Sequence, residues 1–197
     1  MRGLLVALIL VLSTASSGCM SEPEQGFQWP EPTTGECDLD PSYGLNCGLF
    51  LDAFDIPHQS LINPVSGELW IVYLGGYIKS WDGSNLELVA DLSEVVNRCH
   101  IEQGLLGVAF EEDFDVSGNI LISYVAEGSC EGPNQSNLTL ATISMNSQGM
   151  IQSSSISILK EIEQPYRNHN GGYLLPLGDN NYLWGVGDGG GSDDPHQ

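Results

Sequence analysis

The alternation of apolar and polar positions predicts short β-strands from about residue 69 onward. These segments are rich in β-branched and aromatic residues, and Gly, Asn, Asp or Ser clusters separate them. No long segment has the 3.6-residue period of a helix: residues 91–98 read as one helical turn or a loop, and residues 111–119 as a turn. The sequence therefore predicts an all-β fold. Its expected strands are 69–73, 77–81, 86–92, 104–110, 120–126, 138–145, 156–162, 173–177 and 182–186.

The expected strands fall into groups of about four, which repeat roughly every 50 to 60 residues. Such a repeat is typical of β-propeller blades, and a β-sandwich is the rival architecture. Residues 48–197 supply roughly two and a half blades, whereas propellers close with about 4–8. We therefore expect this chain to be the N-terminal part of a longer protein.

The first 47 residues indicate export rather than a folded domain. A positive end at Arg2 precedes an apolar run over residues 4–12, and small residues stand directly before Cys19. This pattern resembles a lipoprotein signal that would leave Cys19 lipidated, although Ser16 stands where an aliphatic residue is usual. The alternative is an ordinary secretory signal. We expect a signal peptide over 1–19, a tether with a small disulfide loop over 20–47, and a membrane-anchored domain over 48–197 at the cell surface or in the periplasm.

Four further cysteines suit an oxidising compartment. Four cysteines allow three pairings, of which we favour Cys37–Cys47 and Cys99–Cys130. The first pairing closes a short loop, and the second joins segments on either side of a predicted hairpin. The cysteine spacings give no zinc pattern, so we predict no metal site from them.

The charge balance is strongly acidic, with 5 Lys and Arg residues against 26 Asp and Glu residues. Nothing in this composition offers a basic stripe for phosphates, which excludes nucleic acid as a partner. The acidic residues are scattered along the chain, as expected for a well-hydrated surface. Two N-glycosylation sequons begin at Asn134 and Asn137, and both are candidate surface sites in an exported chain.

The most informative chemistry lies at the two feet of a predicted hairpin. Strands 173–177 and 182–186 flank a turn at 178–181, so folding about this turn would set Gly171 roughly opposite Asp188. His169 and Asp188 would then emerge at the same end of the sheet. A histidine beside a carboxylate is how a general base is oriented, and the surrounding glycines would leave space for a flat or bulky ligand. The alternative is a pair that only caps loops.

Two stretches of the sequence have a family resemblance. Residues 102–110, an acidic turn ending at Phe114, and residues 118–124 resemble the glucose/sorbosone dehydrogenase family. Residues 168–172 and 187–191, followed by Asp194-Pro195, are similar to the most distinctive stretch of that family. The resemblance spans about residues 56–197, and it implies a six-bladed propeller.

The resemblance also implies roles for particular residues. His169 matches the histidine that takes the proton of a sugar's anomeric hydroxyl while hydride passes to pyrroloquinoline quinone (PQQ). Asp188 matches the carboxylate that orients this histidine and lies near the substrate. Glu102 falls where a glutamine near the cofactor is usual, and Asp193 where some members carry a glutamine near the sugar. Arg167, next to the histidine motif, either faces the cofactor or lies on the surface.

These expectations leave three functions open. The first is an exported PQQ- and calcium-dependent sugar dehydrogenase that passes electrons to an external acceptor. The second is a non-catalytic binding module of the hedgehog-interacting-protein type, and the third is a calcium-dependent lactonase on a similar propeller. PQQ carries three carboxylates, which Glu102 would repel unless it were protonated or neutralised by calcium. The resemblance implies that the calcium ligands and the cations that contact the cofactor lie mainly in later blades, so we expect this part alone to be inactive.

Overall fold

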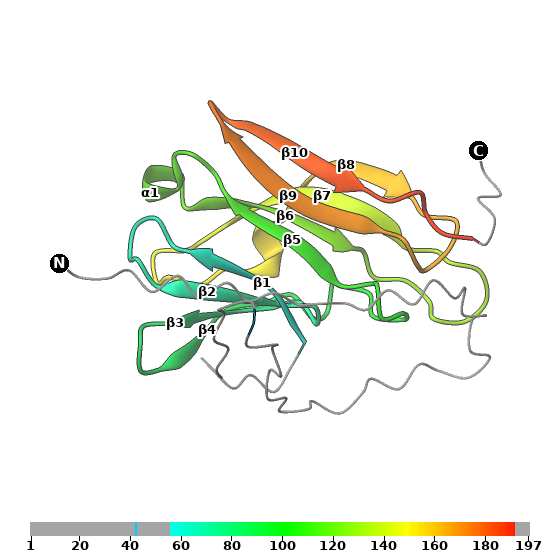
Figure 1. Ribbon diagram of the computed structural model, residues 1–197, viewed down its shortest axis with the longest axis horizontal. Helices are drawn as coiled ribbons and strands as arrows, with labels where there is room; N and C mark the ends of the chain where they lie inside the picture. Colours follow the sequence, from blue (N-terminus) through cyan, green and yellow to red (C-terminus); the bar gives the residue numbers. More distant parts are fainter. Residues whose placement is uncertain (1–41, 43–55, 192–197) are drawn as a thin grey trace.

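The structure is a computed structural model that describes residue 42 and residues 56–191 (Figure 1). Nearly all of its regular structure is antiparallel β-sheet. Its strands are β1 (Pro57–Ile62), β2 (Leu69–Tyr73), β3 (Tyr77–Trp81), β4 (Leu86–Asp91), β5 (Leu105–Phe110), β6 (Asn119–Val125), β7 (Asn137–Ser144), β8 (Ser157–Glu163), β9 (Gly171–Gly178) and β10 (Asn181–Val186). One helical turn, α1 (Phe114–Ser117), and one 3-10 turn, η2 (Ser153–Ser155), complete the elements.

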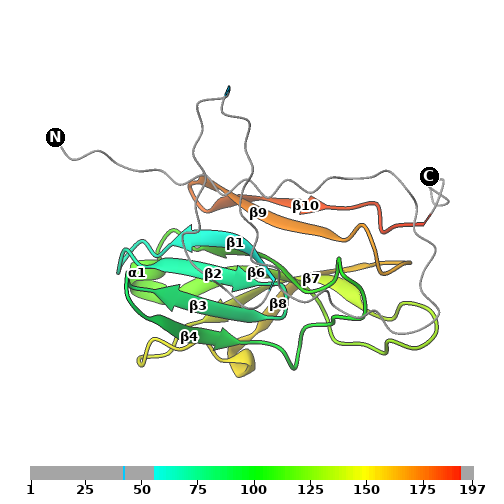
Figure 2. The same ribbon diagram turned by 60° about the horizontal axis from the view of Figure 1, so that its bottom comes forward.

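The strands form two complete four-stranded sheets and one hairpin. Their orders are β1-β2-β3-β4, β5-β6-β7-β8 and β10-β9, and every neighbouring pair is antiparallel. Figure 1 shows β9 lying along β5, and β1 contacts β5 on its other flank. Figure 2 shows strands β1 to β4 side by side, with the β9–β10 hairpin above them. The first strand of each sheet is therefore the one next to the neighbouring sheet, as in the blades of a propeller. The predicted all-β propeller, represented here by about two and a half blades, is confirmed.

The first two blades share one apolar core. Trp70, Ile78 and Ile122 are among its fully buried members, and the ring of Trp70 lies 4.9 Å from that of Phe110. A side-chain amide also joins the inner strands: Gln59 Nε2 donates to the Val108 carbonyl at 2.9 Å, and Val108 N donates to Gln59 Oε1 at 2.9 Å. This amide reproduces the paired bonds of a β-ladder between two separate sheets.

The second and third blades meet where the backbones of β5 and β9 approach closely. A Cβ on Gly107 would collide with the Gly172 carbonyl oxygen, so both positions accommodate only hydrogen at this distance. Leu174 is 1 % exposed in the interface, and Trp184 Nε1 donates to Ser123 Oγ at 2.9 Å. The third blade is thus fixed to the second by close packing and by a partly buried hydrogen bond.

The structure differs from the sequence prediction at two segments. Strand β1 is absent from the sequence prediction, because its apolar alternation is weak: it has a glutamine at an inward position and Ile62 at an exposed one. The segment 111–119, predicted to be a turn, contains helix α1, which buries Phe114 and ends at Gly118 with φ 67°. Gly118 N donates to the Phe114 carbonyl at 2.9 Å and closes this single turn.

The predicted disulfide Cys99–Cys130 is present, with a Cα–Cα distance of 5.1 Å. The predicted Cys37–Cys47 pair, Cys19 and Asp193 lie outside the described residues. The domain boundaries at 19 and 47 also lie outside them and stay predictions. Within residues 56–191, no helix is long and apolar enough to cross a membrane.

Candidate functional site

The β9–β10 hairpin carries the two candidate catalytic side chains at its open end. Its tight turn uses Asp179 and Asn180, both with positive φ (53° and 56°), which is the backbone of a type I′ turn. The strand register differs from the one expected: Gly171 pairs with Val186, not Asp188. Two bulges, one beyond the turn and one before Val186, each shift the register by one residue.

His169 and Asp188 nevertheless meet just beyond the paired strands. His169 Nδ1 lies 3.0 Å from Asp188 Oδ1, and both side chains are about half exposed, at 52 % and 51 %. Gly190 N donates to the same Asp188 oxygen at 2.9 Å. The aspartate is therefore held by its own loop and holds the imidazole in turn, which is the arrangement of a base and its orienting group.

The pKa of the Asp188 carboxyl is lowered from its ordinary value of 3.8. The largest cause is the hydrogen bond from Gly190 N, and the hydrogen bond from His169 comes second. A lowered pKa keeps Asp188 ionised at neutral pH. The carboxylate can then accept the Nδ1 proton of His169 and stabilise a positive charge on the ring.

The glycines at this end serve the contact between the two feet of the hairpin. A Cβ on Gly187 would collide with the His169 carbonyl oxygen, and one on Gly190 would collide with Asn168 Oδ1. The expectation that these glycines leave space for a ligand is therefore wrong at both positions. Their missing side chains let the segments bearing His169 and Asp188 pack directly on each other.

Glu102 reaches the same end from the segment that precedes β5. Its Oε2 accepts the main-chain N–H of His169 at 2.5 Å, and its carbonyl accepts from Asn170 Nδ2 at 3.2 Å. Asn170 is 1 % exposed and also donates from Nδ2 to the Arg167 carbonyl at 2.9 Å. The structure thus joins Glu102 to the loop that carries His169, and its predicted role in cofactor binding stays a prediction.

Arg167 lies against the β6–β7 loop. Its Nη2 donates to the Cys130 carbonyl at 3.1 Å and to the Gly132 carbonyl at 2.7 Å, with a longer contact of 3.5 Å to Ser129. Of the two predicted positions for Arg167, the structure therefore has it bound to its own protein surface. A role in cofactor binding stays a prediction.

Asn134, predicted as a glycan acceptor, connects the β6–β7 loop to the segment that leads to His169. Its Nδ2 donates to the carbonyls of Gln164 at 2.6 Å, Tyr166 at 3.1 Å and Ser136 at 3.1 Å. The second sequon residue, Asn137, is the first residue of β7 and is partly buried. Glycosylation at either position stays a prediction, and at Asn134 it would compete with these bonds because the glycan is attached to Nδ2.

The described residues bring a histidine and an aspartate together, but they place no cation beside this pair of the kind that the carboxylates of PQQ need. Lys79 lies over the Tyr73 ring, 4.9 Å from its centre, and Arg167 is bound to the β6–β7 loop. Within residues 56–191, no lysine or arginine forms a hydrogen bond or ion pair with His169 or Asp188. No cluster of three or more metal-ligating side chains occurs there either. Binding of a trianion at this end would therefore need cations from elsewhere in the protein.

The family assignment follows from a comparison of the sequence with family models. The glucose/sorbosone dehydrogenase model matches residues 55–197. The chain belongs to the glucose/sorbosone dehydrogenase family. The resemblance predicted from the sequence is confirmed, and the matched range contains Glu102, His169 and Asp188.

Solved structures share the fold of this glucose/sorbosone dehydrogenase family member. The PQQ-bound aldose sugar dehydrogenase of Streptomyces coelicolor superposes with a TM-score of 0.57 at 16% identity, covering 71% of this chain and 40% of that protein. The soluble aldose sugar dehydrogenase of Escherichia coli, in its apo form, gives 0.55 at 24% identity, covering 68% and 38%. A glucose dehydrogenase gives 0.58 at 18% identity, covering 68% and 38%. The chain thus spans about two fifths of the length of these structures.

Sequence reasoning missed two site residues that only the fold identifies. Asn170 was read as part of a motif, yet it is buried and ties the histidine loop to the Glu102 carbonyl. Gln103 is fully buried beside Glu102, and its Nε2 donates to Asn134 Oδ1 at 3.4 Å. For both residues the available signal was a polar side chain between a predicted site residue and a glycine: Asn170 follows His169, and Gln103 follows Glu102.

Proposed function

We propose that the complete protein is a PQQ-dependent dehydrogenase that oxidises the anomeric carbon of an aldose to a lactone. The observation that supports this proposal most is the His169–Asp188 pair, 3.0 Å apart and open to solvent at one end of the propeller fragment. Membership of the glucose/sorbosone dehydrogenase family supports the same chemistry. The relative bound to PQQ makes this quinone the cofactor to test first.

The two side chains divide the work of a general base. Asp188 occupies Nδ1 of His169, which leaves Nε2 to accept the proton of the sugar's anomeric hydroxyl. The ionised carboxylate stabilises the imidazolium that this proton transfer creates. PQQ, when bound, supplies the two-electron acceptor for the hydride from the same carbon. The substrate would then leave as the lactone.

The remaining parts of the proposal concern residues elsewhere in the protein. We propose that later blades supply the cations and the calcium ligands that a trianionic quinone needs, and that an external acceptor reoxidises it. Cys19 would carry a lipid that anchors the exported protein to a membrane. Asp193 and Arg167 remain candidates for contacts with the sugar and the cofactor.

The test uses the full-length protein, loaded with PQQ and calcium and assayed with a panel of aldoses and a reducible dye. We expect dye reduction, and we expect His169→Ala to lower kcat by about 10²- to 10⁴-fold, the usual contribution of a general base. Dye reduction by no sugar in the panel would overturn the oxidation and favour the non-catalytic binding module. Lactone hydrolysis by the same preparation, without dye reduction, would favour the lactonase.

A matched pair of aspartate variants separates the role of Asp188 from a general effect of charge. Asp82 is also exposed, and it also accepts main-chain N–H bonds in a turn, from Ser84 at 2.7 Å and Asn85 at 2.8 Å. We expect Asp188→Asn to lower kcat at least about 10-fold, because the amide cannot stabilise the imidazolium. Asp82→Asn should leave kcat unchanged. Equal rates for the two variants would remove Asp188 from the mechanism.

A further inference from the structure

The carboxylate of Glu102 is directed at the protein backbone. Its Oε2 accepts the main-chain N–H of His169, the residue proposed as the base. The position where relatives were expected to carry a cofactor-binding glutamine is therefore occupied by a side chain committed to the base itself.

The backbone of His169 needs such support. Its φ of 57° lies in the left-handed region, which is uncommon for residues other than glycine and costs about 1 kcal/mol or more. A residue keeps this conformation only when the surrounding contacts specify it. The hydrogen bond to Glu102 is donated by the main-chain N–H of His169, which lies on the N–Cα bond that this φ describes.

A second contact ties the same two segments together. Asn170 Nδ2 donates to the Glu102 carbonyl at 3.2 Å, and Asn170 is 1 % exposed. Glu102 thus binds two successive residues: His169 through its side chain and Asn170 through its main-chain carbonyl. This double contact fixes the direction in which the imidazole leaves the loop.

The segment that carries Glu102 is itself firmly placed. Cys99, three residues earlier, is cross-linked to Cys130. Glu102 N donates to His100 Nδ1 at 3.2 Å, and Gln103 N donates to the His100 carbonyl at 3.0 Å. Gln103, the next residue, is fully buried. A rigid neighbour is what a positioning contact requires, because a mobile one would transmit no constraint.

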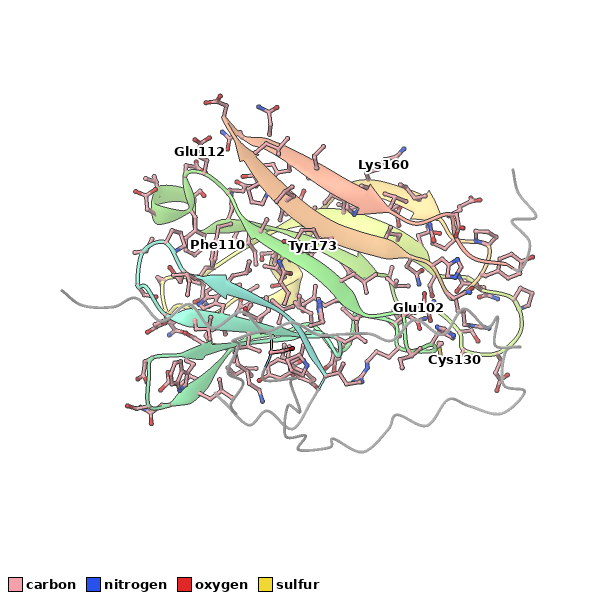
Figure 3. The ribbon with its side chains drawn as sticks, viewed as in Figure 1. Glu102, Phe110, Glu112, Cys130, Lys160 and Tyr173 are labelled. Atoms are coloured by element: carbon pink, nitrogen blue, oxygen red, sulfur yellow. A yellow bond between two sulfur atoms is a disulfide. The ribbon has the colours of Figure 1, made fainter. Side chains whose placement is uncertain are left out.

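The opposite end of the hairpin shows the same type of contact. Glu112 Oε2 accepts the main-chain N–H of Asn180 at 2.8 Å, at the tip of the β9–β10 turn. In Figure 3, Glu112 and Glu102 lie toward opposite ends of the hairpin, with Tyr173 between them. Two glutamates that flank β5 therefore accept main-chain hydrogen bonds from the two ends of the β9–β10 hairpin. Of the two, Glu102 is the one beside the candidate base.

We infer that Glu102 is a positioning residue that fixes His169 by accepting its main-chain hydrogen bond. This inference deepens the proposed function and rests on it for its effect on turnover. It assigns Glu102 to the histidine, not to the quinone. The acceptor oxygen, which a glutamine would also offer, carries the positioning.

The test compares Glu102→Gln and Glu102→Ala in the full-length protein, with Glu112→Ala as the matched control. Amide hydrogen exchange over residues 164–172 reports the His169 N–H directly, without any cofactor. We expect exchange at His169 to become about 10- to 100-fold faster in Glu102→Ala, and to stay within about threefold in Glu102→Gln. Glu112→Ala should accelerate exchange at Asn180 and leave His169 unchanged.

Steady-state kinetics then separate positioning from ligand binding. We expect Glu102→Ala to lower kcat about 10- to 100-fold with a change in the sugar KM below about threefold, and Glu102→Gln to restore most of kcat. Equal losses in the two variants would overturn the inference, because charge and not the acceptor would then matter. Unchanged exchange at His169 in Glu102→Ala would overturn it as well.

The two proposals fail in different ways. If the wild-type protein oxidises no aldose, the proposed function is wrong, yet the exchange measurement still decides whether Glu102 holds His169. If the wild type is active and Glu102→Ala weakens PQQ binding at unchanged kcat, Glu102 is a cofactor ligand and the inference is wrong. Each outcome therefore bears on one proposal.

Discussion

The contact between β5 and β9 predicts a large penalty for a single methyl group. Gly107 has no unusual φ, so alanine is compatible with its backbone conformation. Its Cβ would nevertheless overlap the Gly172 carbonyl oxygen and lie 3.1 Å from Leu174 N. Both of these atoms belong to the backbone of β9, and neither can rotate away. Strand β9 must move for the methyl group to fit.

The magnitude follows from two opposing terms. Overpacking of this kind costs about 1–3 kcal/mol. Replacing glycine by alanine also restricts the unfolded chain and returns about 0.4–1 kcal/mol. The difference spans about 0–2.6 kcal/mol, and because the overlap is with backbone atoms we expect Gly107→Ala to destabilise the protein by about 2 kcal/mol, in the upper half of that range.

The assay is urea unfolding of the full-length protein, with Gly185→Ala as the control. A Cβ on Gly185, in β10, would meet only the Tyr173 carbonyl oxygen, at 3.7 Å. We expect this control to be neutral or slightly stabilising, because only the unfolded-chain term applies. Equal midpoints for Gly107→Ala and Gly185→Ala, at equal slopes, would refute the close approach of β5 and β9.

Three further predictions concern the disulfide, the aspartate and the β6–β7 loop. Cys99→Ser should lower the free energy of unfolding by about 3–4 kcal/mol, measured in urea, because the disulfide closes a sequence separation of 31 residues. The pKa of the Asp188 carboxyl is lower in the folded protein than its ordinary value of 3.8, so its contribution to stability is complete above pH 3.8 and is lost as the pH falls through the folded-state pKa. Carboxyl NMR titration should show this lowered pKa. Asp188→Asn should remove the part of the pH dependence of acid unfolding that this carboxyl causes. Asn134→Ala should cost about 1–3 kcal/mol, because the Gln164 carbonyl loses its donor, whereas Asn137→Ala should cost less in the same unfolding assay.

Strands with a clear apolar pattern were predictable from the sequence alone. The expected strands 69–73, 77–81 and 182–186 start or end within a residue of β2, β3 and β10. β3 alternates between buried and partly buried positions, and β2 is a continuous apolar run buried on both faces, so in both strands local sequence and tertiary packing agree. β1 could not be found in this way, since its place depends on the Gln59 amide, which bonds to a strand 49 residues away.

The candidate site was predictable in its composition and not in its connections. The hairpin pattern was enough to bring His169 and Asp188 to one end, although two bulges changed the register between them. The bond from His169 N to Glu102 spans 67 residues, and no local pattern encodes it. The glycines show the same limit: sequence reveals where a side chain is missing, and only the fold reveals which neighbour fills the space.

Because His169 and Asp188 stand at the two feet of one hairpin, their separation is a property of a single supersecondary unit. This distance between His169 and Asp188 does not depend on how many blades the propeller has or on how the ring closes. The Glu102 contact crosses from one blade to the next, so it changes whenever the blades shift relative to each other. A displacement of one blade against the other would therefore reach the pair only through the main chain of the histidine loop, at its hydrogen bonds to Glu102.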